Sequence, residues 1–224
     1  MGLFSSPAVI PAKVVDPVTI EFGGSQVDAV ARTTYTFTSV GIGTAAAGRK
    51  VVVAAANANA TTTAAVSSMT IAGVNATKVV AANHDPDDTA DTELWQAVVA
   101  TGTTATIVVT YDRATYRCGI GTWAVYGAAS AAHATATNFS DPLSASINVP
   151  EKGGCIGSVG SANVVLTYTW TNLTENYDQV VQEGIIHSGA SETFATTQTG
   201  LTITANGSST PSRRAMALAS WGPA

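Results

Sequence analysis

The chain has 224 residues, a formal net charge of −5 and a pI near 5.0, and only 11% of its residues are charged. An average soluble domain is roughly 25% charged, so Thr, Ser and Asn supply most of the polarity here. The scattered Lys and Arg residues argue against nucleic-acid binding, which needs them clustered. No segment approaches the ~18 consecutive apolar residues of a membrane span. So neutral a surface predicts a protein that packs against other proteins.

The first predicted unit is an extended arm over residues 1–24. Pro7, Pro11 and Pro17 prevent a helix and disfavour pairing within a central strand. The apolar side chains among them would be costly to leave in water. We therefore expect the arm to dock on a neighbouring subunit or to lie over the chain's own core. The candidate assembly contacts in this arm are Leu3, Phe4, Val9 and Ile10.

After the arm, the sequence predicts short β-strands separated by turns, which is typical of a sandwich or barrel. Residues 34–38 alternate strictly and place Tyr35 and Phe37 on one face. Residues 49–55 are more continuously apolar, which favours a strand covered on both faces. A turn at residues 73–75 predicts a hairpin. The other predicted strands cover residues 94–99, 104–111, 121–126, 144–149, 163–170, 201–204 and 215–221.

No segment sustains a helical period, and no change of composition marks a linker between domains. Residues 101–104 and 199–202 are alike, but over too few positions to establish a repeat. We therefore predict an all-β protein: an antiparallel, jelly-roll-like β-sandwich in which residues 25–224 form a single domain after the N-terminal arm.

Motifs for catalysis or cofactor binding are absent. The segment nearest to a phosphate-binding loop covers residues 43–51, but its Arg49-Lys50 pair leads into a β-run instead of a helix. Cys118 and Cys155 are expected to be buried apolar side chains, with the question of their pairing open. We predict no enzyme activity, no catalytic residue and no cofactor.

One acidic segment, residues 84–93, leaves calcium binding open. Its carboxylates could supply oxygen ligands to a hard cation. However, the segment lacks the glycine turn and the terminal glutamate of an EF-hand loop, and charged loop tips are commonly just solvated. We predict no metal site.

The tryptophans separate into two groups. Trp95, Trp123 and Trp170 lie in strand-like runs, where packing in the core is the expected role. Trp221, three residues from the end, is a candidate either for an interface or for anchoring the final strand. We count Trp221 as the fifth candidate assembly contact.

The pattern of strands resembles the jelly-roll-like β-sandwich virion proteins of tailed bacteriophages and gene-transfer agents, which occur as capsid decoration, head-spike and tail-fibre components. The resemblance spans roughly residues 33–222. The segments that carry it most clearly are residues 40–43, 49–53, 70–77, 94–97, 101–109 and 123–127.

This resemblance implies a non-enzymatic structural protein of a virion, assembled in the host cytoplasm. The expected role is a capsid-surface decoration or cement protein, or a vertex-associated subunit, that bridges neighbouring shell proteins. The expected partners are copies of this chain and other virion proteins such as the major capsid protein, with no nucleic acid and no membrane.

Two alternatives remain open. A receptor- or carbohydrate-binding module of a head spike or tail fibre, with a host-surface glycan as partner, should expose aromatic and amide side chains in its loops. The side chains concerned are Asn138, Phe139, Asn172 and Tyr177. A polysaccharide-cleaving enzyme should instead bring carboxylates together in a cleft. The carboxylates concerned are Glu175, Asp178 and Glu183.

Overall fold

The computed structural model describes residues 15–58, 64–83, 90–162, 166–182 and 184–224. These residues form β-strands and turns, and no helix occurs among them. All strand pairs within the sheets are antiparallel, so the predicted all-β, antiparallel class is confirmed. Within the described part of the chain there is accordingly no helix that could cross a lipid bilayer.

The first half of the chain, up to residue 126, forms two sheets. Its strands are β1 (Thr19–Asp28), β2 (Arg32–Gly41), β3 (Lys50–Ala58), β4 (Val66–Ile71), β5 (Val74–Asn75), β6 (Thr77–Asn83), β7 (Ala90–Val98), β8 (Thr104–Thr115) and β9 (Cys118–Tyr126). One sheet has the order β1-β9-β3-β7-β6, and the other has the order β2-β8-β4-β5. The predicted hairpin around residues 73–75 is the connection between β4 and β5.

The second half, from residue 134, forms two further sheets. Its strands are β10 (Ala134–Asn138), β11 (Leu143–Val149), β12 (Gly154–Ala162), β13 (Tyr168–Thr171), β14 (Thr174–Gln182), β15 (Ile185–Thr193), β16 (Gln198–Gly207) and β17 (Arg213–Trp221). The sheet orders are β10-β17-β12-β15-β14 and β11-β16-β13.

The strand order of the first half recurs in the second. Replacing β1, β9, β3, β7 and β6 by β10, β17, β12, β15 and β14 converts one five-stranded sheet into the other, and β2-β8-β4 corresponds in the same way to β11-β16-β13. Each half is therefore a jelly-roll-like sandwich whose chain alternates between two sheets. The expectation of a single sandwich over residues 25–224 is wrong, because two sandwiches lie in tandem.

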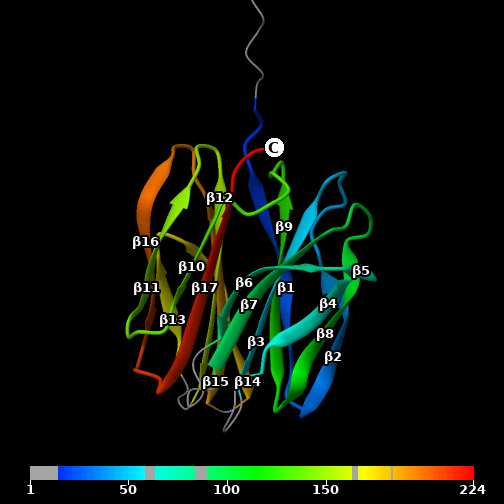
Figure 1. The fold of residues 1–224 in the computed structure, drawn as a ribbon, viewed down its shortest axis with the longest axis vertical. Coiled ribbons are helices and arrows are strands. Elements are labelled where there is room, and N and C mark those ends of the chain that lie inside the picture. Colours follow the sequence, from blue (N-terminus) through cyan, green and yellow to red (C-terminus); the bar gives the residue numbers. More distant parts are fainter. Residues whose placement is uncertain (1–14, 59–63, 84–89, 163–165, 183) are drawn as a thin grey trace, which may run out of the picture.

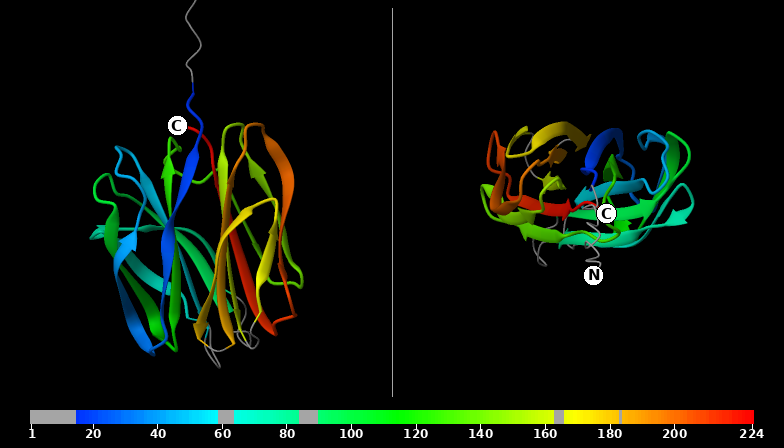
Figure 2. Two further views of the ribbon diagram at one scale, coloured as in Figure 1. Left: turned by 180° about the vertical axis from the view of Figure 1, so that it is seen from behind. Right: turned by 90° about the horizontal axis from the view of Figure 1, so that it is seen from above.

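The four sheets stack as four layers, with the two five-stranded sheets in the middle (Figure 1, Figure 2). One core lies inside the first sandwich, and a second core lies inside the second. A third core lies between the two sandwiches and contains side chains from β3, β7 and β9 of one and from β12, β14 and β17 of the other. Because the middle sheets are covered on both faces, β9, β12 and β17 are buried almost throughout.

The two sandwiches also join through the segments that directly follow β9 and β17. Ala128 and Pro223 form an isolated antiparallel bridge. Ala129 N donates to Gly222 O and Ala224 N donates to Gly127 O, each at 2.9 Å. We call this reciprocal pair the seam. It places the C-terminus at the same end of the molecule as the start of β1 (Figure 1).

Candidate functional site

The N-terminal arm is shorter than predicted. β1 begins at Thr19 and pairs along its length with β9, so residues 19–24 belong to the first sandwich and the expected boundary at residue 24 is wrong. Pro17 is the last proline before β1, so every residue of β1 has a backbone N–H that can donate a hydrogen bond to a neighbouring strand. Four candidate assembly contacts lie outside the described residues: Leu3, Phe4, Val9 and Ile10.

The fifth candidate contact, Trp221, is fully buried inside the molecule. Its indole Nε1 donates to Gln96 Oε1 at 3.0 Å, which links β17 of the second sandwich to β7 of the first. Trp123 makes a similar bond in the opposite sense, from β9 to Asn176 Oδ1 on β14 at 2.7 Å. Of the two roles considered for Trp221, the structure therefore places it as the anchor of the final strand and not on the surface.

Lys152 holds the base of the arm, residues 15–18, against the second sandwich. Its Nζ donates to Val15 O at 3.2 Å, and its backbone carbonyl accepts from Val18 N at 2.8 Å. Lys152 itself has a positive φ of 57° in the turn that precedes β12, a conformation that a residue other than glycine adopts at a cost. The two bonds fix the arm base to the second sandwich.

A partly open cavity of about 420 Å³ lies beside this point. Its walls come from the arm base on one side and from the connection between β15 and β16 on the other. Its lining residues are Pro17, Val18, Lys152, Thr193, Phe194 and Ala195. The lining is mostly apolar, which suits the burial of hydrophobic side chains.

Arg49, part of the sequence nearest to a phosphate loop, is fully buried and binds backbone carbonyls. Its guanidinium donates to the carbonyls of Val99, Gly43, Gly102 and Thr101 at 2.8–2.9 Å. Five N–H donors in a fixed plane match such a set of acceptors. Arg49 therefore ties the segment after β2 to the turn between β7 and β8, and it is not free to bind a phosphate.

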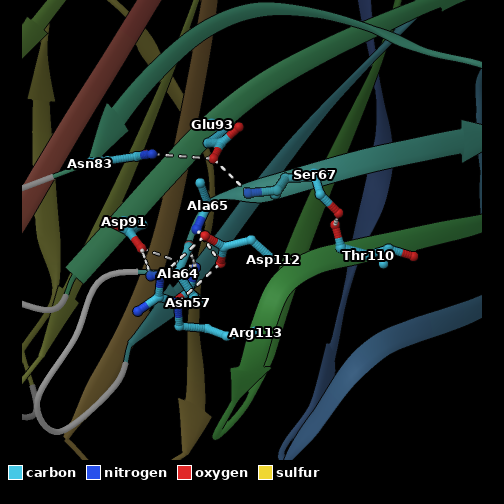
Figure 3. A network of polar contacts seen from close by, with 11 residues as sticks. Asn57, Ala64, Ala65, Ser67, Asn83, Asp91, Glu93, Thr110, Asp112 and Arg113 are labelled. Atoms are coloured by element: carbon cyan, nitrogen blue, oxygen red, sulfur yellow. Dashed lines mark hydrogen bonds and ion pairs between the residues drawn. The ribbon is translucent and has the colours of Figure 1, made fainter.

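Two carboxylates from the acidic segment point into the first sandwich instead of into solvent (Figure 3). Asp91 Oδ2 accepts from Ala64 N at 3.2 Å, and Glu93 Oε1 accepts from Val66 N at 2.8 Å. Glu93 also accepts from the indole of Trp95 and pairs with Lys78 Nζ at 3.0 Å. The bonds to Ala64 N and Val66 N hold the segment that leads into β4.

The Asp91 carboxyl is the most perturbed acid of this network. Burial raises its pKa to about 7, although hydrogen bonds from Ala64 N and from the Asn57 amide act in the opposite direction. Asp91 Oδ1 and Asn57 Oδ1 are both buried acceptors with no hydrogen-bond partner. A proton on Asp91 Oδ1 would make that oxygen a hydrogen-bond donor instead of an unpaired acceptor, which agrees with the raised pKa.

The rest of the acidic segment, residues 84–89, lies outside the described residues. Among the described residues, no three His, Cys, Asp or Glu side chains come close enough together to hold a metal ion. Asp91 and Glu93 are both buried, and Asp91 Oδ2 and the Glu93 carboxylate bind backbone amides and Lys78 instead of facing a solvent-accessible cation site.

A chain of buried polar groups crosses between the sandwiches around His187. Thr92 Oγ1 on β7 lies 2.6 Å from Ser158 Oγ on β12, and His187 Nε2 on β15 lies 3.1 Å from Ser158 Oγ and 2.9 Å from the Tyr177 hydroxyl. Burial lowers the pKa of His187 to about 3, so the ring is neutral. A serine and a histidine in contact could indicate a nucleophile, but Ser158 is fully buried and beyond the reach of a substrate.

Among the described residues, the carboxylates considered for an enzyme do not come together as a catalytic pair. Asp178 Oδ2 accepts from Tyr168 N at 2.7 Å and so connects β14 to β13, while burial raises its pKa. Glu175 is exposed on the same strand, and Glu183 lies outside the described residues.

The loop side chains considered for glycan binding are largely engaged. Tyr177 is buried between the sandwiches, and Phe139 packs against the same core. Asn138 accepts from Ser140 N and Ser144 N, and Asn172 donates to Thr202 O.

The cysteines are free and buried, and they belong to different cores. Burial raises the pKa of Cys118 to about 12 and also raises that of Cys155. They therefore do not pair, and their thiolates are inaccessible at neutral pH.

The outermost sheet of the second sandwich, β11-β16-β13, contains no Asp, Glu, Lys or Arg. Its outward-facing positions carry hydroxyls and amides instead, and these pair across the strands. Ser144 Oγ lies 3.0 Å from Thr204 Oγ1, and Ser146 Oγ lies 3.3 Å from Thr202 Oγ1. We call this surface the neutral face.

Comparisons with protein-family models, with curated proteins and with solved structures found no match to this chain.

Proposed function

We propose that this chain is a non-enzymatic structural subunit of a virion, a capsid-surface decoration or cement protein that bridges neighbouring shell proteins. The neutral face is the observation that carries the proposal. Interface cores are depleted of charged residues, because burying a charge costs free energy unless a partner compensates it. A sheet surface that offers only hydroxyls, amides and aliphatic groups avoids that cost.

The anchored arm base supports the same role. Lys152 fixes the arm base, and the sequence before it, residues 1–14, is mostly apolar apart from Ser5, Ser6 and Lys13. The resemblance to jelly-roll-like virion proteins of tailed phages and gene-transfer agents agrees with the tandem jelly-roll-like sandwiches.

The test is incorporation into particles. Thr202 is exposed in the middle of the neutral face, so Thr202→Lys should leave the fold intact while placing a charge in the contact. We expect wild-type protein to copurify with virus particles and to label their surface in electron micrographs, and the Thr202→Lys protein to be lost from them. Ser209→Lys, in the exposed turn between β16 and β17, is the matched control and should be incorporated normally.

Two results would contradict the proposal. One is the absence of wild-type chain from purified particles. The other is specific binding of the isolated monomer to a glycan array, which would favour the receptor-binding alternative.

A further inference from the structure

We propose that the cavity beside the arm base is the receptor site for the N-terminal arm of a second copy of this chain, with apolar side chains from residues 3–10 as its occupant. The inference rests on the proposed function, because it names the contact by which neighbouring subunits would be joined.

The internal repeat gives two equivalent segments to compare, the one that precedes β10 and the one that precedes β1. The segment leading into β10 crosses to the first sandwich, where Gln96 Nε2 donates to Ser130 O at 3.1 Å. The segment leading into β1 crosses to the second sandwich, where Lys152 Nζ donates to Val15 O at 3.2 Å. Both segments therefore contact the other sandwich, where a side chain donates a hydrogen bond to one of their backbone carbonyls.

The cavities at the two places differ in size. The cavity beside Ser130 has a volume of about 190 Å³, against about 420 Å³ beside the arm base. The larger one is lined chiefly by apolar groups, including Phe194 and Val18, and it is open to the outside. An apolar cavity of this size suits an apolar guest.

The sequence of the arm favours a guest from another copy. Residues 3–15 contain no Gly, and Pro7 and Pro11 fix their own φ and bias the residues before them toward extended backbone. The fourteen residues before Val15 could span up to about 48 Å if fully extended. An extended arm would carry Leu3 and Phe4 away from its own cavity and within reach of that of a neighbouring copy.

Mixed disulfide trapping tests this contact directly in the full chain. Four variants, Leu3→Cys, Phe4→Cys, Val9→Cys and Ile10→Cys, are each mixed with Ala195→Cys protein and oxidised. The native cysteines are buried in separate cores and do not compete. Ala195 is an exposed lining residue, and a disulfide requires the two Cα atoms to approach within about 7 Å.

We expect a cross-linked dimer in at least one mixture, and none when Ser209→Cys, exposed beyond the other end of β16, replaces Ala195→Cys. We also expect Ala195→Glu, which puts a charge into the cavity, to weaken self-association about tenfold or more in sedimentation experiments. Ser209→Glu is the control and should leave association unchanged.

The inference is overturned if no mixture gives a dimer, or if a link forms only within a single chain that carries both substitutions. Either result with the chain still present on particles leaves the proposed function standing. Cross-linked dimers from a chain that never joins a particle would instead support the arm contact and contradict the virion role.

Discussion

Arg49 and Asp91 illustrate, at the scale of single residues, how this chain uses its few charges. The Arg49 guanidinium donates its hydrogen bonds to backbone carbonyls. Asp91 accepts a hydrogen bond from the backbone N–H of Ala64, just before β4. Arg49 lies in the segment that is nearest to a phosphate-binding loop, and Asp91 lies in the acidic segment that was considered for calcium. The sequence could not show their roles, because the partners of each lie 27–53 positions away or in a turn whose geometry depends on the fold.

The raised pKa of Asp91 predicts a stability change with pH. In the unfolded chain the carboxyl ionises near 3.8, whereas in the folded protein it ionises near 7. Its contribution to stability is complete below pH 3.8 and is lost as the pH rises through 7, at about 1.4 kcal/mol per unit of displaced pKa. The difference in unfolding free energy between wild type and Asp91→Asn, measured by urea titration, should therefore fall between pH 4 and pH 8.

His187 supplies a comparison of opposite sign. Its pKa is lowered from 6.5 to about 3 by burial, so its contribution is complete above pH 6.5 and is lost as the pH falls toward 3. The difference between wild type and His187→Gln should fall on acidification instead. If the difference in unfolding free energy between wild type and Asp91→Asn did not change with pH, the pKa of the Asp91 carboxyl would not be raised in the folded protein.

At the scale of elements, the sequence predicted the strands better than their arrangement. The alternation at residues 34–38 and the two-sided burial of residues 49–55 are confirmed in β2 and β3. The sequence does not reveal the repeat, because equivalent strands share their burial and not their side chains: β3 reads KVVVAAANA, and β12 reads GCIGSVGSA. Many different small residues fit a strand that is covered on both faces, so two halves with the same fold need not have similar sequences. The only similarity noted between them is that of residues 101–104 and 199–202.

The approach of the middle sheets depends on glycine at two facing positions. A Cβ on Gly121 of β9 would lie 2.2 Å from the Tyr177 hydroxyl, and one on Gly189 of β15 would lie 2.4 Å from the same ring. Gly121→Ala should therefore destabilise the protein by about 1–3 kcal/mol through overpacking. Thermal or urea unfolding measures this loss.

A double-mutant cycle assigns the loss to that contact. In a Tyr177→Ala background the added methyl group has room, so Gly121→Ala should cost little there. An equal cost in both backgrounds would mean that the methyl group clashes with something other than the Tyr177 ring.

At the scale of the whole molecule, the two sandwiches form one continuous body with a reciprocal seam. Near the seam, Gly127 O accepts from Ala224 N, and a Cβ on Gly127 would lie 3.0 Å from Pro17 O. The C-terminus and the arm base therefore meet at the same residue. The linker between the sandwiches, residues 129–133, occupies the corresponding place on the other side of the seam.

This arrangement predicts that the chain tolerates circular permutation. A protein that starts at Ala131, continues through Ala224 and a short Gly/Ser linker to Val15, and ends at Ser130 should keep all the strands and all three cores. We expect its circular dichroism spectrum to match that of the wild type and its Tm to lie within a few degrees.

Opening the chain inside β12, between Ser158 and Val159, is the matched control and should abolish folding, because that strand is buried throughout. Failure of the Ala131 permutant, with the control equally unfolded, would mean that the order in which the sandwiches are connected is essential.

The shared exit of the two ends has a practical side. A fluorescent protein or peptide epitope fused after Ala224 would emerge next to the arm base and would crowd the arm contact proposed above. Cargo inserted near Ser209, at the distant turn between β16 and β17, leaves that end unobstructed. Engineers who wish to display a foreign sequence on an assembly of this protein should therefore begin there.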